Sequence, residues 1–393
     1  MSEASGDIVF IRNSANHDPA EWCGVRVEPG SSAAMNLTLS ESYSSQPVTA
    51  PVHVWRGEEP GPAVALTAAV HGDEINGTGV IRRILREKPF QLKAGTLVMV
   101  PVVNMLGFER HARYLPDRRD LNRSFPGSKD GSLAGRLAHS FFQAITKRCD
   151  YGIDLHTAAV RRTNFSNVRA DMSDARLAAF ARAFGAELIV DGKGPKGSLR
   201  QSACRVGCAT LILEAGEVWK VEPAVGAYAL HGIKNCLRYL GMTEGKPLEP
   251  PYRIETDTTK WVRAEYGGFL EFHIAPGQIV EKGEALATNT NIAGDEQNTI
   301  YAPRSGVILG MTTMPSVAPG DPICHIAFSK KGALVKAGRV VEGLSADTIH
   351  ARVRGDLASS VAVTEYDGAG QQAEESAEQS AGQALTGGGT GSG

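Results

Sequence analysis

The first two-thirds of the chain alternates between two patterns of apolar and polar residues. Short apolar runs, rich in β-branched and aliphatic side chains, predict buried strands at 64–70, 96–103, 151–156 and 209–213. The segments between them predict helices over 75–87, 133–148 and 175–184. Upstream of residue 50, alternating stretches such as 35–39 predict a strand or two beside this unit. Because strands and helices alternate, we expect an α/β domain in which helices flank a mixed sheet.

The pattern changes after a linker at 241–251 that is rich in glycine and proline. Short strand-like runs separated by turns follow at 267–270, 275–280, 302–308 and 317–321. The turns resemble those of the barrel-sandwich hybrid seen in biotinyl and lipoyl carrier domains. A carrier needs an acceptor lysine on its exposed hairpin, and no lysine occurs between Lys282 and Lys330. We therefore expect an all-β domain that forms a wall of a neighbouring site.

These patterns divide the chain into four segments. We expect N-terminal strands over 1–50, an α/β domain over 51–245, a barrel-sandwich-like β domain over 255–330 and a C-terminal extension over 331–393. From about residue 368 the extension contains almost no large apolar residue. Such a segment cannot bury enough apolar surface to fold, so this end should be disordered.

Composition and charge narrow the class of protein. The 393 residues are 42% hydrophobic and 21% charged with a net charge of −2, which is typical of soluble globular proteins and gives no support for nucleic-acid or membrane binding. No apolar run reaches the ~20 residues that span a bilayer, and the N-terminus lacks the features of a signal peptide. The six cysteines are scattered. We therefore expect reduced thiols and a cytoplasmic location, and the sequence leaves homo-oligomerisation open.

Two of the predicted strands end in side chains that bind metals. His71 and Glu74 follow the first apolar run, and His156 closes the run at 151–156. Either segment alone is more typical of a structural histidine. Together they supply two imidazoles and a carboxylate, which suit a catalytic zinc that keeps its fourth position for water. We predict one Zn²⁺ per chain, held by His71, Glu74 and His156.

Amide hydrolysis also needs a proton shuttle, because the water loses a proton and the departing amine gains one. Glu214 ends the apolar strand at 209–213, the same placement that the two histidines have. A solvated acid at a strand end is the alternative. Glu217 is close in sequence but lies beyond the turn at Gly216. Glu214 is therefore the predicted catalytic base.

Four ordered motifs resemble the succinylglutamate desuccinylase/aspartoacylase family, whose members are relatives of the zinc carboxypeptidases. The motifs are His71-x-x-Glu74, Asp120-Leu121-Asn122-Arg123, Asp154-Leu155-His156-Thr157 and the strand-end Glu214. The resemblance covers roughly residues 50–330. It implies a zinc-carboxypeptidase-like mixed sheet and a metal-dependent deacylase.

The resemblance also implies roles for polar side chains near the metal. Arg113, in an Arg-Tyr pair ahead of the second motif, matches the arginine that stabilises the oxyanion. Asn122 and Arg123 match the pair that grips the substrate carboxylate, and Arg200 matches a second carboxylate-binding arginine. Asp120 is expected to orient its loop.

Two further features bear on the substrate. Arg162 belongs to a group of arginines after His156 that favours an anionic substrate, and we predict that it lines the pocket. In aspartoacylase the C-terminal domain supplies a tyrosine to the substrate, whereas the matching stretch at 278–281 has none. This departure weakens the case for aspartoacylase activity itself.

The leading hypothesis is a zinc-dependent amidohydrolase that removes the acyl group from a small N-acyl amino acid. One alternative is a zinc carboxypeptidase acting on short peptides, which a domain covering the site would disfavour. Another is a catalytically idle binding protein of the same fold, which the complete set of metal ligands and base disfavours. The acyl group and the amino acid are not fixed by the sequence.

Overall fold

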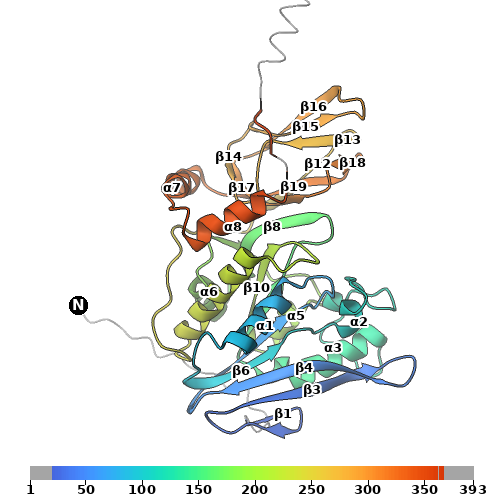
Figure 1. Ribbon diagram of the computed structural model, residues 1–393, viewed down its shortest axis with the longest axis vertical. Coiled ribbons are helices and arrows are strands. Elements are labelled where there is room, and N and C mark those ends of the chain that lie inside the picture. The colour runs from blue at the N-terminus through green and yellow to red at the C-terminus, as the bar shows by residue number, and fades with distance from the viewer. Residues whose placement is uncertain (1–19, 362, 367–393) are drawn as a thin grey trace, which may run out of the picture.

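The computed structural model describes residues 20–361 and 363–366, and within them a 13-stranded mixed sheet organises the chain (Figure 1). Its strands are β3 (Ser32–Glu41), β4 (Pro47–Arg56), β5 (Glu59–Ala68), β6 (Ala94–Val100), β7 (Tyr151–His156), β8 (Arg162–Ala170), β9 (Leu188–Asp191), β10 (Ala209–Gly216), β11 (Ile254–Thr256), β12 (Thr259–Arg263), β14 (Ile279–Val280), β17 (Gly306–Thr312) and β19 (Pro322–Phe328). The main path runs in the order β12-β19-β17-β8-β10-β7-β5-β6-β4-β3. In its middle, β10, β7, β5 and β6 are parallel neighbours. The expected mixed sheet is thus confirmed.

Helices cover both faces of this sheet. They are α1 (Asn76–Glu87), α2 (Met105–Phe108), α3 (Leu133–Ala144), α4 (Ala175–Ala183), α5 (Leu199–Arg205), α6 (Pro223–Tyr239), α7 (Lys331–Glu342) and α8 (Ile349–Ala358), with short 3₁₀ turns at Leu121–Arg123 and Thr146–Arg148. Side chains alternate along β6: Leu97 and Met99 join the core under α1, α4, α6 and α8, whereas Val98 and Val100 join the core under α3 and α5. Because both faces are covered, all seven residues of β6 are buried.

The predicted elements occur, with shifted ends. The strand expected at 96–103 begins and ends earlier, at 94–100, and the helix expected over 133–148 ends at Ala144, after which the chain forms a separate 3₁₀ turn. The strands expected before residue 50 are β3 and β4, and β4 continues to Arg56 and pairs with β6. They extend the main sheet at its edge. A small ribbon of β1 (Glu21–Trp22) and β2 (Val25–Arg26) lies outside it.

The β-rich segment after residue 254 divides between two sheets. β13 (Gly268–Phe272), β15 (Ala285–Thr290), β16 (Glu296–Tyr301) and β18 (Ser316–Val317) form a four-stranded sheet, which lies at the end of the molecule opposite β3 and β4 (Figure 1). β12, β19 and β17 instead continue the main sheet, because β17 pairs with β8. A single hydrogen-bonded sheet therefore connects the metal-ligand strands with the C-terminal strands.

The C-terminal extension contributes two helices to the same core: α8 packs against α6 and β8, and α7 packs against β11. Arg354 of α8 donates to the carbonyl of Gly277 and lies over the ring of Phe165, so this helix joins the turn before β14 to β8. The disorder expected from about residue 368 falls outside the described residues. No helix among the described residues is both long and apolar enough to cross a membrane.

Candidate metal centre and its pocket

His71 and Glu74 lie in a tight turn that follows β5. Ala69 adopts a left-handed conformation (φ 49°), and the amide of Glu74 donates to the carbonyl of His71 over 3.1 Å. The turn packs so closely on α2 that a Cβ added to Gly72 would lie 2.0 Å from the carbonyl carbon of Gly107. Only glycine permits this approach. The close packing fixes the direction in which the two side chains leave the turn.

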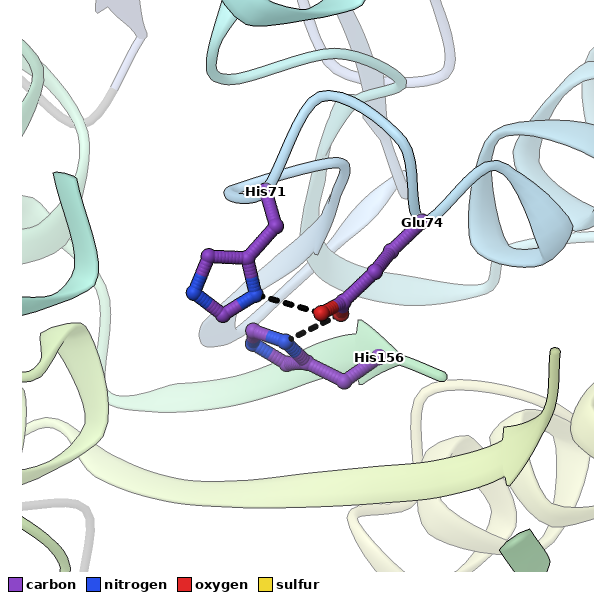
Figure 2. A group of neighbouring side chains, drawn as sticks. All are labelled: His71, Glu74 and His156. Carbon is purple, nitrogen blue, oxygen red and sulfur yellow. Dashed lines mark hydrogen bonds and ion pairs between the residues drawn. The ribbon is translucent and has the colours of Figure 1, made fainter. Parts of the chain in front are cut away.

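His156 reaches the same point from the neighbouring strand. β5 and β7 are parallel, with Ala68 opposite Leu155, so His156 closes its strand beside the turn that carries His71. Glu74 Oε1 lies 2.6 Å from His71 Nδ1, and Glu74 Oε2 lies 2.8 Å from His156 Nδ1 (Figure 2). Each imidazole thus contacts a different oxygen of the same carboxylate, and the two ring centroids lie 5.1 Å apart.

These three side chains are buried and fit a metal ion. Their ligand atoms all lie within 4.8 Å of one another, and each side chain is at most 5% exposed. Burial alone would raise the pKa of Glu74, but the two imidazoles outweigh it and hold that pKa well below its usual range. Burial would lower the pKa of His156, but Asp154 and Glu74 raise it. Acidic groups in this cluster therefore favour a cation, and two imidazoles with a carboxylate suit zinc.

A second layer of polar groups orients the histidines. His156 Nε2 lies 2.7 Å from Asp154 Oδ2, and the other oxygen of Asp154 accepts from the hydroxyl of Thr67 over 2.7 Å. This bond directs His156 Nδ1 toward Glu74. On the other side, Asp120 Oδ1 lies 3.2 Å from His71 Nε2.

Arg113 lies at the edge of the metal cluster. Its guanidinium donates to Glu74 Oε1 and to Asp120 Oδ2, both over 3.1 Å. The carboxylate of Asp120 also caps the 3₁₀ turn that follows it, accepting from the amide of Asn122 over 2.8 Å. Asp120 therefore ties its own loop to Arg113 and His71.

Glu214 lies on β10, directly opposite His156 of β7. The structure places it inside the strand, whereas the sequence pattern ends the strand at Leu213. Its Oε2 accepts from the side-chain amide of Asn164 over 3.0 Å, and its Oε1 lies 3.8 Å from Arg169 Nε. One oxygen of Glu214 thus accepts a hydrogen bond from an amide, and the side chain of Glu214 also lines the pocket.

The side chains predicted to bind the substrate differ in how they are held. Asn122 is buried and its Oδ1 accepts from the amide of Leu199 over 2.9 Å, which fixes the loop against α5. Arg123 donates to the carbonyl of Asn122 over 2.7 Å. Arg200 is 5% exposed, and its Nε and Nη1 have no hydrogen-bond partner within the described part of the chain. A buried guanidinium without a partner is costly unless a ligand supplies the anion.

The metal cluster opens into a pocket of about 250 Å³ that brings the predicted residues together. Its walls carry the three metal-cluster residues, Glu214, and the five arginines Arg113, Arg123, Arg162, Arg169 and Arg200. The loop at 289–296 of the β domain is not part of this wall. It lies in the hairpin of β15 and β16 in the four-stranded sheet, and Ile292 at its tip is 95% exposed.

Trp261 of β12 and His325 of β19 form the wall that the C-terminal strands contribute. Neither residue is among those predicted from the sequence to form the site. They stand 64 positions apart and no local motif contains them. Strand alternation could have placed each on one face of its strand, but it does not indicate which face meets the pocket.

Comparison with known proteins gives three informative matches. Residues 60–240 match the model of the succinylglutamate desuccinylase/aspartoacylase catalytic domain. The chain is 30% identical over 291 residues to N-alpha-acetyl-L-2,4-diaminobutyric acid deacetylase of Halomonas elongata, which covers 70% of this chain and 84% of that protein. It is also similar to the crystal structure of a succinylglutamate desuccinylase/aspartoacylase from Rhodobacter sphaeroides, with 26% identity, a TM-score of 0.67, and coverage of 78% of this chain and 99% of that one.

A further likeness concerns the fold alone. The product-bound structure of the ectoine utilization protein EutE from Ruegeria pomeroyi superposes with a TM-score of 0.68 at 22% identity. The alignment covers 80% of this chain and 100% of that one. The fold therefore recurs in a protein with little sequence identity.

Proposed function

This chain belongs to the succinylglutamate desuccinylase/aspartoacylase family and is a hydrolase of amide bonds, and from that premise we propose that it is a zinc-dependent deacylase of small N-acyl amino acids. One observation carries the proposal. Glu214 stands in register with His156, so a carboxylate outside the metal cluster faces the same pocket as His71, Glu74 and His156. Water activation and proton transfer can then occur at one place.

The substrate class follows from the size and charge of the pocket. A volume of about 250 Å³ suits a small molecule. The unpartnered guanidinium of Arg200 supplies a binding site for a carboxylate, and Arg123 and Asn122 lie in the same wall. The deacetylase of Halomonas elongata acts, by its name, on an acetylated amino acid. A small N-acyl amino acid fits the pocket volume, carries the carboxylate that Arg200 can bind, and resembles the substrate named for that deacetylase.

The chain's own residues divide the work of hydrolysis. Zinc bound by His71, Glu74 and His156 would polarise the scissile carbonyl and lower the pKa of the attacking water. Glu214 takes the proton that the water loses and delivers it to the departing amine. Asn164 keeps one oxygen of Glu214 occupied, which leaves the other oxygen for the proton. Arg113 donates to the oxygen on which negative charge develops.

The proposal extends to the division of the chain and to its topology. We assign catalysis to residues 51–245, with a zinc-carboxypeptidase-like arrangement of strands, and the pocket wall to residues 255–330. Trp261 and His325 support this assignment because they line the pocket from β12 and β19. The wall narrows the site and favours amino acid derivatives over peptides.

A substrate panel tests the proposal. The purified protein is incubated with N-acetyl, N-succinyl and other N-acyl amino acids, with dipeptides as the comparison, before and after treatment with a chelator, and the released amine is measured. We expect release from at least one N-acyl amino acid, loss of activity with the chelator and recovery on adding zinc. Cleavage of dipeptides alone, or full activity without metal, would contradict it.

A further inference from the structure

Three side chains that line the pocket, each from a different strand, contact one another through their flat groups. The rings of Trp261 and His325 lie with their centroids 4.6 Å apart and their planes 9° apart. On Trp261, the guanidinium carbon of Arg162 lies 4.8 Å from the ring centroid. These residues come from β12, β19 and β8, and all three line the pocket. We call them the Arg162–Trp261–His325 stack.

The register of the sheet explains how such distant residues meet. Trp261 lies opposite His325, His325 lies opposite Gly310 of β17, and Gly310 lies opposite Asn164 of β8. A Cβ on Gly310 would lie 2.5 Å from Asn164 Oδ1. Because Gly310 has no side chain, this row of cross-strand neighbours has free space between His325 on β19 and Asn164 on β8. Asn164, at the end of the row, donates a hydrogen bond to Glu214.

Arg162 is held by aromatic packing and not by an acid. Within residues 20–361 and 363–366 no carboxylate forms an ion pair with its guanidinium, which rests on the indole face. Burial, Arg263 and Arg113 lower its pKa, and Asp321 opposes them by a smaller amount. A cation near two other cations binds an anion readily, because the anion relieves their mutual repulsion. The guanidinium donors are therefore free for a ligand.

His325 supports the stack as a neutral ring. Burial lowers its pKa to about 4, and Arg169 and Arg162 contribute to that shift. A neutral imidazole can lie flat on the indole without adding a charge that repels Arg162. Trp261 thus contacts both a neutral ring and a cation, and these two contacts restrict the orientation of the indole.

We propose that Trp261, supported by His325, is a positioning residue that aims Arg162 at a second carboxylate of the substrate. The inference rests on the proposed function and deepens it. Arg200 and Arg123 supply the site for one carboxylate, so a further fixed guanidinium selects substrates that carry another. That carboxylate belongs either to the side chain of the amino acid or to the acyl group.

Two matched pairs of substrates distinguish these sources. N-Acetyl-L-glutamate and N-acetyl-L-glutamine differ only in the side-chain carboxylate. N-Succinyl-L-glutamine and N-acetyl-L-glutamine differ in the acyl group, which carries the second carboxylate in the former. We expect kcat/KM to be at least about tenfold higher for the charged member of one pair, since a charge-assisted hydrogen bond is worth about a factor of ten or more. The pair that shows the preference identifies the source.

A double-mutant cycle then tests the positioning role. Arg162→Ala should abolish the preference, mainly by raising KM for the charged member. Trp261→Ala should reduce it to a similar extent in the native background and have no further effect in the Arg162→Ala background. His325→Phe keeps a flat ring on the indole and should retain the preference, whereas His325→Ala should lower it. A merely structural tryptophan would change both members of a pair equally.

Arg304→Ala is the matched control, because Arg304 also lies over an aromatic ring, that of Phe328, but does not line the pocket. Zinc content and thermal midpoint are measured for each variant. Equal kcat/KM within both pairs, or additive losses in the double mutant, would overturn the inference while leaving the deacylase function intact. If no N-acyl amino acid is cleaved, the proposed function fails. Binding of the same substrate pairs is then measured by calorimetric titration, and equal affinity for the charged and neutral member of both pairs overturns the inference.

Discussion

Glu214 lies directly opposite His156 in the parallel pair of β10 and β7. Residues in register on neighbouring strands project to the same face, so the carboxylate and the imidazole emerge side by side at one edge of the sheet. Glu214 lies outside the three-residue metal cluster and forms its hydrogen bond with Asn164. One strand spacing therefore separates the proposed metal ligand His156 from the proposed proton carrier Glu214.

Glu214→Gln tests that separation of roles. The amide keeps the shape of the side chain but cannot carry the proton, so kcat should fall by a factor of about 10² or more. Zinc content should stay near one equivalent, because Glu214 is not a ligand. Turnover at the native level would disprove the assignment of the base.

Loss of any proposed metal ligand should instead lower the zinc content. His71→Ala, Glu74→Ala and His156→Ala each leave two protein donors, which are too few to hold zinc tightly. Elemental analysis after gel filtration should find well below one equivalent in each, with Glu214→Gln as the control that retains metal. Full occupancy in His156→Ala would remove that residue from the ligand set.

Asp154→Asn tests the residues that orient the proposed metal ligands. The bond from Asp154 Oδ2 to His156 Nε2 orients the imidazole, and its partner Thr67 orients Asp154. We expect zinc affinity to fall about 10–100-fold, measured by competition with a chromogenic chelator. Thr67→Val should cause a smaller loss, since it leaves the Asp154–His156 contact in place. If Asp154→Asn binds zinc as tightly as the native chain, this orienting role is wrong.

Arg200→Met should lower activity without lowering the stability of the fold. Two nitrogens of the buried guanidinium have no partner among the described residues, and an apolar side chain of similar length removes the free-energy cost of burying that charge. The urea midpoint should therefore stay the same or rise, while kcat/KM falls about 10–100-fold because a carboxylate contact is lost. A lower midpoint with unchanged KM would show that Arg200 is structural.

The acid sensitivity of folding should depend on His325. Its pKa is about 4 in the folded chain against 6.5 as the ordinary value, so the unfolded chain binds more protons between these values and stability falls as the pH drops through this window. Between pH 7.5 and pH 5 this loss is about 2 kcal/mol. His325→Asn should lose correspondingly less over the same interval in urea titrations. Equal losses in the two proteins would contradict the buried neutral state.

The local sequence determined the chemistry of the centre to a large extent. His71, Glu74, His156 and Glu214 each stand at or beside the end of a short apolar run, and the carboxyl ends of parallel strands meet at one edge of a sheet. The pattern therefore predicts which side chains come together without any knowledge of distant contacts. The same reasoning explains why strand ends shifted by a few residues did not matter: the strand order and direction already set the edge.

Only the tertiary structure decided which residues surround that centre. Trp261 and His325 reach the pocket because β17 pairs with β8, and Gly310 leaves space between His325 and Asn164. Pairing between strands that are far apart in sequence depends on the register of the whole sheet, and a shift of one residue would turn both side chains to the other face. The burial of Arg200 without a partner is likewise a property of packing. The spacing of the motifs along the sequence thus predicts the proposed metal ligands and base, whereas the register of the assembled sheet decides which side chains form the rest of the pocket wall.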